Sequence, residues 1–259
     1  PGLAGGVIQL LTAPLALLVD ALALATSAVL VLSIRSPEPA PHPDSRHGRG
    51  WGAIFAGLRP LWADPIVRSI AVSTTIYLFF SNLMIPVFVL YATRELGVTP
   101  GTLGLIFGFG GVGSVCGAVV ALPTARRWGI GPAMIGADLA GALFLLLVPL
   151  ARAAPLAAVP LLMAAQFGSQ LMGTVFYVVQ TSVRQARTPD RVAGRLNASY
   201  SFVTRSLIPA GALLGGVLGQ IVGLQATLAI GALGLLLPVV WLCLSPVRGL
   251  RTIDAPEQR

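Results

Sequence analysis

The chain has 259 residues, of which 55% are hydrophobic and only 10% are charged, and its mean hydropathy is +0.84. A soluble domain carries charge on roughly a quarter of its residues, so this composition excludes an ordinary water-soluble protein and favours one whose surface faces lipid. The net charge of +8 comes from arginines in short loops between apolar runs, a distribution typical of membrane topology and contact with lipid headgroups rather than of nucleic-acid binding.

Apolar stretches divide the chain into four parts, because a membrane-crossing helix needs roughly 20 mostly apolar residues. Residues 1–34 hold the end of one helix, Pro1–Gln9, and one complete span, Ala13–Ile34. Residues 35–65 form a linker, residues 66–247 form a bundle of six spans, and residues 248–259 form a tail. The six spans are predicted at Ser69–Tyr91, Leu96–Ala125, Trp128–Ala151, Ala153–Val183 and, as two crossings that break near Gly219–Gly223, within Leu196–Val247. The predicted fold class is therefore an all-α polytopic membrane protein.

The linker has two segments of different composition. Arg35–Gly50 is rich in Pro, Arg and Ser and is expected to be flexible. Trp51–Trp62 mixes aromatic, small and basic residues and stops before Asp64-Pro65. This second segment is expected to be a short helix, either lying on the inner membrane surface or solvated within the linker.

The positions of the arginines predict the orientation of the spans. Alternate connections carry fourteen arginines on one side and two, Arg94 and Arg152, on the other. Positively charged loops stay in the cytoplasm, so the linker and the C-terminus are expected there, in a multi-pass protein of the cell membrane.

Cysteine and histidine give no sign of a metal site, a cofactor or an enzyme. Cys116 and Cys243 lie inside apolar runs, and His42 and His47 lie in the linker without a cluster of carboxylates or thiols. No nucleophile with an acid-base partner is present at a common membrane depth. We therefore expect no catalytic residues, no bound metal and no cofactor.

A weak internal repeat relates the two ends of the chain. The segment that begins with GGVI at 5–8 resembles the segment that begins with GGVL at 215–218, and a proline precedes each. Both place a glycine-rich helix end, a short outer turn and an apolar return helix in the same order. Parallel repeats of this kind occur in transporters, and the repeat predicts a first half with about four more spans upstream of Pro1.

The order of the spans, the long central loop and the repeat resemble the major facilitator superfamily, most closely its bacterial macrolide-efflux and siderophore-export-like members. Three motifs carry the resemblance: PGLAG at 1–5, APLALLVDA at 13–21 and RQARTPDRVAGR at 184–195. The resemblance covers essentially the whole chain, from the end of the fifth helix of a twelve-helix transporter to its C-terminus. It implies a small-molecule substrate, a proton gradient and an N-terminal half that completes the transporter.

The turn with Arg126 and Arg127 resembles the basic gating loop of that superfamily. The acidic residue that usually precedes the arginine pair is replaced by Thr124-Ala125. A salt-bridge latch at this loop is therefore in doubt, and the pair has either a gating role or only an anchoring one.

Polar side chains inside the spans are candidates for substrate binding, because they are costly in lipid. Gln166, Gln170, Tyr177 and Gln180 follow helical spacing with Gly173 and Arg184 on the fourth span of the bundle. The stripe is expected to face either a water-filled path or partners on neighbouring helices. Ser73, Tyr77 and Ser81 form a weaker stripe on the first span, with Phe80 and Asn82 beside them.

Arg205 is the most deeply placed charge, roughly 13 Å into a helix that starts near Leu196. Asn197, Ser201 and Thr204 lie at helical spacing with it, and Tyr200 is next to them in sequence. This face is expected either to meet a polar or anionic group in a cavity or to hold a structural arginine.

Asp20 and Asp138 are the only carboxylates inside the predicted spans. A carboxylate in a low dielectric can hold a proton, which makes both candidates for proton coupling. Both are expected toward the ends of their spans, where capping or interfacial pairing is the simpler role.

These patterns predict a secondary active transporter, a proton-coupled exporter of small amphipathic organic compounds that works by alternating access between two helical halves. The competing hypothesis is a truncated or non-transporting membrane protein, either a fragment or a scaffold. Membrane lipids are the expected surroundings in both cases.

Overall fold

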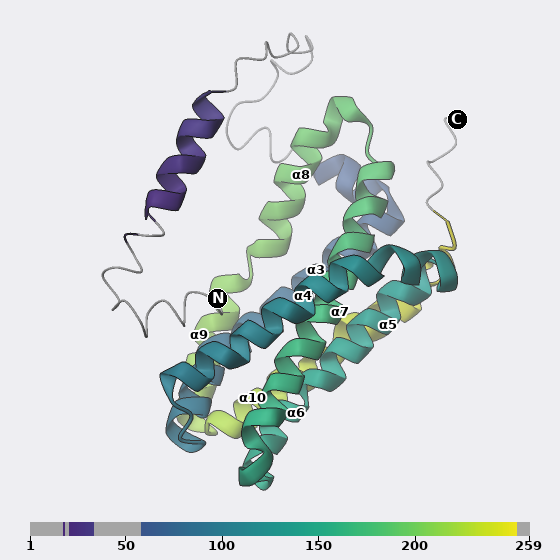
Figure 1. The fold of residues 1–259 in the computed structure, drawn as a ribbon. Coiled ribbons are helices and arrows are strands. Elements are labelled where there is room, and N and C mark those ends of the chain that lie inside the picture. The colour runs from purple at the N-terminus through teal and green to yellow at the C-terminus, as the bar shows by residue number, and fades with distance from the viewer. Residues whose placement is uncertain (1–17, 19–20, 34–57, 253–259) are drawn as a thin grey trace.

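The computed structural model describes residues 18, 21–33 and 58–252, and within them the regular structure is entirely helical (Figure 1). Six helical stretches there are long and apolar enough to cross a membrane. This confirms the predicted all-α fold with a six-helix bundle. The predicted span Ala13–Ile34 is described only as a shorter apolar helix, Ala21–Leu32, and Pro1–Gln9 lies outside the described residues.

The six spans are built from one or two helices each. The first is α3 (Pro65–Leu90) with a π-helical turn (Tyr91–Glu95), and the second is α4 (Pro100–Trp128). The third joins α5 (Ile130–Leu145) to α6 (Leu147–Leu150), and the fourth is α7 (Ala158–Ala186). The last two are α8 (Asp190–Arg205) with α9 (Ile208–Ile221), and α10 (Leu224–Gly234) with α11 (Leu236–Leu244).

Local sequence explains where these helices begin. Asp64 caps α3 by accepting hydrogen bonds from the backbone N–H groups of Ile66 and Val67, and Thr99 caps α4 in the same way through Thr102. Gly129 and Gly223 have φ of 91° and 89°, which an L side chain rarely adopts, and they make the tight turns before α5 and α10. The break expected near Gly219–Gly223 is confirmed.

Two pairs of helices approach closely through glycine. A Cβ on Gly113 or Gly117 of α4 would overlap the carbonyl oxygens of Phe167 or Leu171 on α7. In the same way Gly211 and Gly215 of α9 lie against the backbone of α3. Small residues let membrane helices pack at backbone distance, so α4 with α7 and α3 with α9 form two closely packed pairs.

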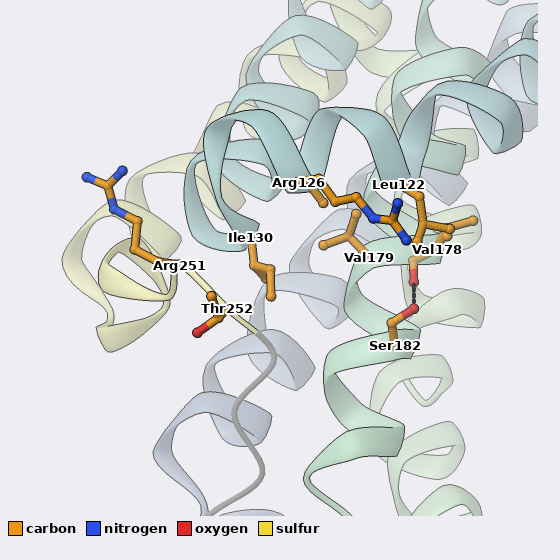
Figure 2. Close-up of a pocket in the computed structure, with 9 residues that line it drawn as sticks. Leu122, Arg126, Ile130, Val178, Val179, Ser182, Arg251 and Thr252 are labelled. Atoms are coloured by element: carbon orange, nitrogen blue, oxygen red, sulfur yellow. Dashed lines mark hydrogen bonds between the residues drawn. The ribbon is translucent and has the colours of Figure 1, made fainter.

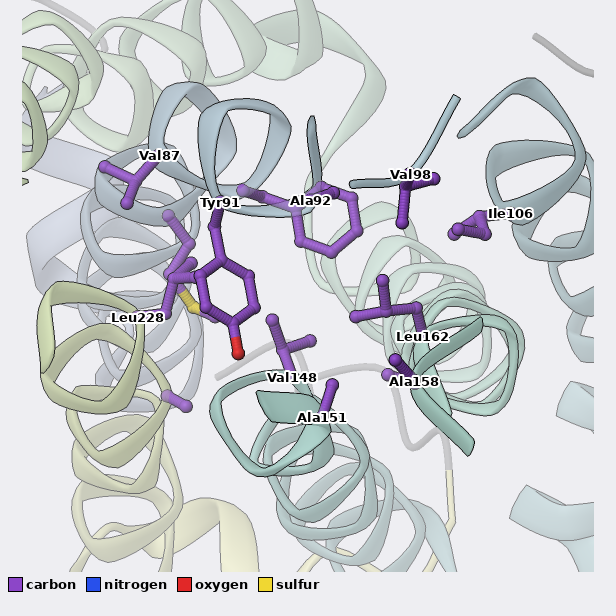
Figure 3. Packing of buried hydrophobic residues seen from close by; sticks show 14 of the residues in the cluster. Val87, Tyr91, Ala92, Val98, Ile106, Val148, Ala151, Ala158, Leu162 and Leu228 are labelled. Atoms are coloured by element: carbon purple, nitrogen blue, oxygen red, sulfur yellow. The ribbon is translucent and has the colours of Figure 1, made fainter. Parts of the chain in front are cut away.

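The buried apolar side chains fall into two clusters at the two ends of the bundle. Figure 3 shows one of them, in which Tyr91 and Ala92 face Val148, Ala151 and the start of α7. The second cluster contains Leu61, Met134, Val179 and Leu242. Each cluster borders one of the polar sites described below, since Met84 and Phe88 of the first line a cavity and Tyr200 of the second forms hydrogen bonds.

Contacts at the two ends agree with the predicted alternation of the arginines. At one end, Asp64 pairs with Arg187 at 2.7 Å and Gly131 N–H donates to the carbonyl of Leu250 at 2.8 Å. At the other end, Arg152 pairs with Glu95 at 2.7 Å. We refer to these as the arginine-rich end and the opposite end.

The short helix before Asp64 packs against the bundle on one side. Residues 58–63 are helical and stop at Asp64 as expected, while the first part of the predicted segment lies outside the described residues. Leu61 is fully buried and belongs to the core cluster at the arginine-rich end. This part of the segment therefore contacts the bundle through Leu61, while Arg59 and Trp62 are exposed.

Candidate functional site

A cavity of about 230 Å³ opens between α3 and α7, and we call it the polar cavity. Phe107 of α4 and Leu145 of α5 close its sides. Its walls combine hydroxyl and amide groups with apolar and aromatic side chains. The lining residues are Tyr77, Ser81, Met84, Ile85, Phe88, Phe107, Leu145, Gln166, Ser169 and Gln170.

The polar groups of the cavity come from two helix faces. Tyr77 and Ser81 are four residues apart on α3, and Gln166, Ser169 and Gln170 are three or four apart on α7, so each set lies on one face. Gln170 is twelve residues, about 18 Å, from the start of α7, near the middle of that helix. The structure thus brings Tyr77, Gln166 and Gln170, all predicted for substrate binding, to one cavity at mid-depth.

Asp138 lies directly beside this cavity. It is 7% exposed, and Ser73 Oγ donates a weak hydrogen bond to its Oδ2 at 3.5 Å. A second hollow of about 10 Å³, enough for at most one water, is lined by Asp138 together with Tyr77, Leu145 and Ser169, which also line the polar cavity. Asp138 is about 12 Å along the span from Ile130, about a third of the way to its end at Ala153.

Gln180 and Tyr200 form a separate polar cluster with Thr74. Tyr200 Oη donates to Gln180 Oε1 at 3.0 Å and lies 3.0 Å from Thr74 Oγ1, and both Tyr200 and Gln180 are buried. The guanidinium carbon of Arg184 lies 4.0 Å above the Tyr200 ring, a cation–π distance. This cluster ties α3, α7 and α8 together. The predicted stripe on α7 is therefore divided, since Gln166 and Gln170 line the polar cavity whereas Gln180 is buried in the hydrogen-bonded cluster.

Four other predicted substrate residues lie away from the polar cavity. Phe80 packs on Gly234 of α10 and edge-on to Phe79, and Asn82 Nδ2 donates to the carbonyl of Leu78 on its own helix at 2.8 Å. Tyr177 is 63% exposed, and Arg205 is exposed at the last residue of α8. Neighbouring residues on a helix point about 100° apart. Phe80 and Asn82 adjoin Ser81 in sequence, but their side chains therefore point away from the cavity that Ser81 lines.

The gating candidates lie at the surface of the bundle. Arg126 and Arg127 are exposed in the last turn of α4, and neither forms an ion pair within the described residues. The described ion pair at this end is Asp64–Arg187 instead. Asp20 lies outside the described residues.

Three residues that were not predicted as site residues take part in these sites. Ser169 lines both hollows, Ser73 contacts Asp138, and Arg184 covers Tyr200. Ser73 and Arg184 belonged to the noted stripes on α3 and α7, and Ser169 lies three residues after Gln166, so helical spacing pointed to all three. Among the residues that the structure describes, no group of three or more His, Cys, Asp or Glu side chains is placed to hold a metal.

Comparison with known proteins identifies the family. No curated protein matches the chain. A family model described as "transmembrane secretion effector" matches residues 1–258, nearly the full length, and this is a family of major facilitator superfamily transporters rather than of enzymes. Six apolar helices, four of which line the polar cavity, agree with that assignment. The chain belongs to the transmembrane secretion effector family of the major facilitator superfamily.

Proposed function

We propose that this transporter is a proton-coupled exporter of small amphipathic organic compounds, and that the polar cavity binds them. Phe88 and Phe107 offer apolar and aromatic surface, while Tyr77, Gln166 and Gln170 offer uncharged hydrogen-bonding groups. A binding site that is mainly apolar with a few converging polar groups suits a compound with both characters. The bundle would work against a second helical bundle by alternating access.

The observation that supports coupling is the wall shared by the two hollows. Tyr77 and Ser169 line both the polar cavity and the hollow with Asp138. A substrate that displaces either side chain changes the surroundings of the carboxylate, and a proton on Asp138 changes the surroundings of the substrate. In this proposal Asp138 carries the proton, and Tyr77 and Ser169 transmit its state.

The proposed orientation places the arginine-rich end and the C-terminus in the cytoplasm. Arg126, Arg184 and Arg187 lie at the same end of the bundle as Arg248 and Arg251, whereas the opposite end carries Arg94 and Arg152. Arginine-rich connections are retained on the cytoplasmic side of membranes. Export then runs from the arginine-rich end to the opposite end of the bundle.

The test is transport by the full-length protein in proteoliposomes, with radiolabelled macrolides and amphipathic dyes as probes. We expect uptake into inverted vesicles to depend on an imposed pH gradient. Gln170→Ala should raise KM about threefold to tenfold, the effect of one hydrogen bond, whereas Gln185→Ala, exposed at the end of α7, should leave KM unchanged. Transport that is indifferent to the pH gradient would overturn the coupling, and equal effects of the two glutamine variants would overturn the site.

Asp138→Asn separates the two parts of the proposal. This variant should lose transport driven by the pH gradient but keep exchange of labelled for unlabelled substrate, because exchange needs no net proton movement. Loss of both activities, with the protein still folded, would place Asp138 in substrate binding rather than coupling.

A further inference from the structure

A second pocket, which we call the surface pocket, lies at the arginine-rich end and is not used by the proposed transport. Its volume is about 410 Å³, within the range of about 300–1,000 Å³ that holds small ligands. It lies between the end of α4, the start of α5, α7 and the segment after α11. The lining residues are Leu122, Ala125, Arg126, Ile130, Val178, Val179, Ser182, Arg251 and Thr252.

The walls of the surface pocket are mostly aliphatic and are held in place by the backbone. Gly131 N–H donates to the carbonyl of Leu250 at 2.8 Å, which fixes the C-terminal segment against the start of α5. Gly129 lies against Arg251 on the same segment. The pocket lies between packed elements, with Leu122, Ile130 and Val179 as its apolar surface.

The charge of the surface pocket is positive. Arg126 and Arg251 are its only charged lining residues, and Arg126 has no carboxylate partner within the described part of the chain. Figure 2 shows the Arg126 side chain extending over the pocket toward Ser182, whereas Arg251 points away from it. A single guanidinium over an aliphatic pocket favours a ligand with one anionic group and an apolar body.

An apolar ridge leads from the pocket along α4 toward the middle of the membrane. Val115, Val119 and Leu122 are 66%, 71% and 51% exposed and lie at helical spacing on one face. Between Pro100 and Ala125 the helix carries no charged residue. The ridge offers a path for an acyl chain, while the pocket lies at the end of the span, at the depth of lipid headgroups.

We propose that the surface pocket binds an anionic phospholipid, with the headgroup phosphate on Arg126 and one acyl chain along Val119 and Val115. Basic pockets between helices near the membrane surface bind lipid headgroups of this charge. The pocket shares no lining residue with the polar cavity, so the lipid is distinct from the transported compound. Bound there, it bridges α4, α5 and α7.

The experiment measures binding of phosphatidylglycerol to the purified full-length protein, by native mass spectrometry and by spin-labelled lipid in phosphatidylcholine vesicles. Arg126→Gln should lower the relative affinity for phosphatidylglycerol about fivefold, the effect of one arginine near a membrane surface. Arg127→Gln is the matched control. It removes the same charge at the next residue, and the Arg127 side chain does not line the pocket.

A second variant, Ser182→Phe, places a ring in the pocket without changing its charge. It should release the bound phosphatidylglycerol while the thermal midpoint in phosphatidylcholine stays close to that of the wild type. Three outcomes would overturn the proposal: equal effects of Arg126→Gln and Arg127→Gln, no loss of lipid in Ser182→Phe, or displacement of the lipid by inorganic phosphate alone. Each readout is independent of transport, so failure here leaves the proposed exporter function standing.

Discussion

Arg187 Nε donates to Asp64 Oδ2 over 2.7 Å, joining the start of the first span of the bundle to the connection between α7 and α8. The other carboxylate oxygen of Asp64 accepts the N–H groups of Ile66 at 2.8 Å and Val67 at 3.3 Å. One side chain therefore caps α3 and holds the α7–α8 connection at the same time. Both side chains are mostly buried, with 16% and 19% of their surface exposed.

Substitution of Asp64 should separate these two roles. Asp64→Asn keeps the cap but removes the charge, and we expect it to lower the free energy of unfolding by about 1–3 kcal/mol. Asp64→Ala should cost about 1 kcal/mol more, because it also removes the cap. Unfolding in detergent measures both, with Glu95→Gln as the control, since its partner Arg152 is 58% exposed and that pair should contribute less than about 1 kcal/mol. An equal cost for Asp64→Asn and Glu95→Gln would contradict the prediction.

The seam between α4 and α7 should not tolerate a methyl group. Gly113→Ala would overlap the carbonyl of Phe167, so we expect a lower unfolding midpoint and a helix pair that is pushed apart. Gly111→Ala, two residues away with no atom within 4 Å of the added carbon, should be neutral or stabilising, because alanine has the higher helix propensity. Similar midpoints for the two variants would show that the helices do not pack at backbone distance.

The hydroxyl of Tyr200 should stabilise the junction of α3, α7 and α8. Tyr200→Phe leaves Gln180 Oε1 buried without the donor it has now, at an expected cost of about 1–3 kcal/mol. Adding Gln180→Leu should recover part of that loss, because the unpaired group is removed as well. The measurement is a double-mutant cycle on unfolding in detergent. Additive effects of the two substitutions would mean that the two side chains are not coupled.

The two ends of the bundle should be labelled from opposite sides of the membrane. In a background with Cys116 and Cys243 replaced by alanine, Thr99→Cys at the opposite end should react with an impermeant maleimide added outside the cell. Arg127→Cys at the arginine-rich end should react only in inverted vesicles. Labelling of both from the same side would refute the predicted orientation.

Much of the fold follows from the sequence because membrane spans leave a simple signal. The six spans of the bundle were found by apolar length, and their ends differ from the structure by only a few residues. The turn at Gly223 was predicted because glycine there interrupts a continuous apolar run. The internal breaks, such as the one at Ser206 and Leu207 between α8 and α9, were not predicted, because apolar composition continues through them.

The site was predicted only in part, because spacing defines a helix face but not the helix it meets. Gln166 and Gln170 were chosen correctly as one face, but the partner wall with Tyr77 depends on how α3 packs against the bundle. Gln180 shares the face of Gln170 in sequence, yet Tyr200 and Thr74 close over it. Spacing could not link Asp138 to this cavity either, because Ser73 and Ser169, which lie beside it, come from α3 and α7.

The two glycine-packed pairs define how the bundle can deform. Backbone contacts make α4 with α7, and α3 with α9, behave as stiff couples, since a shift within either couple would break contacts along its whole length. The polar cavity lies across the boundary between them, with one wall from α3 and the other from α7. Small rotations of one helix pair against the other would therefore widen or narrow the polar cavity without bending a helix. The volume of the cavity then depends on the interface between the two pairs rather than on the shape of any single span.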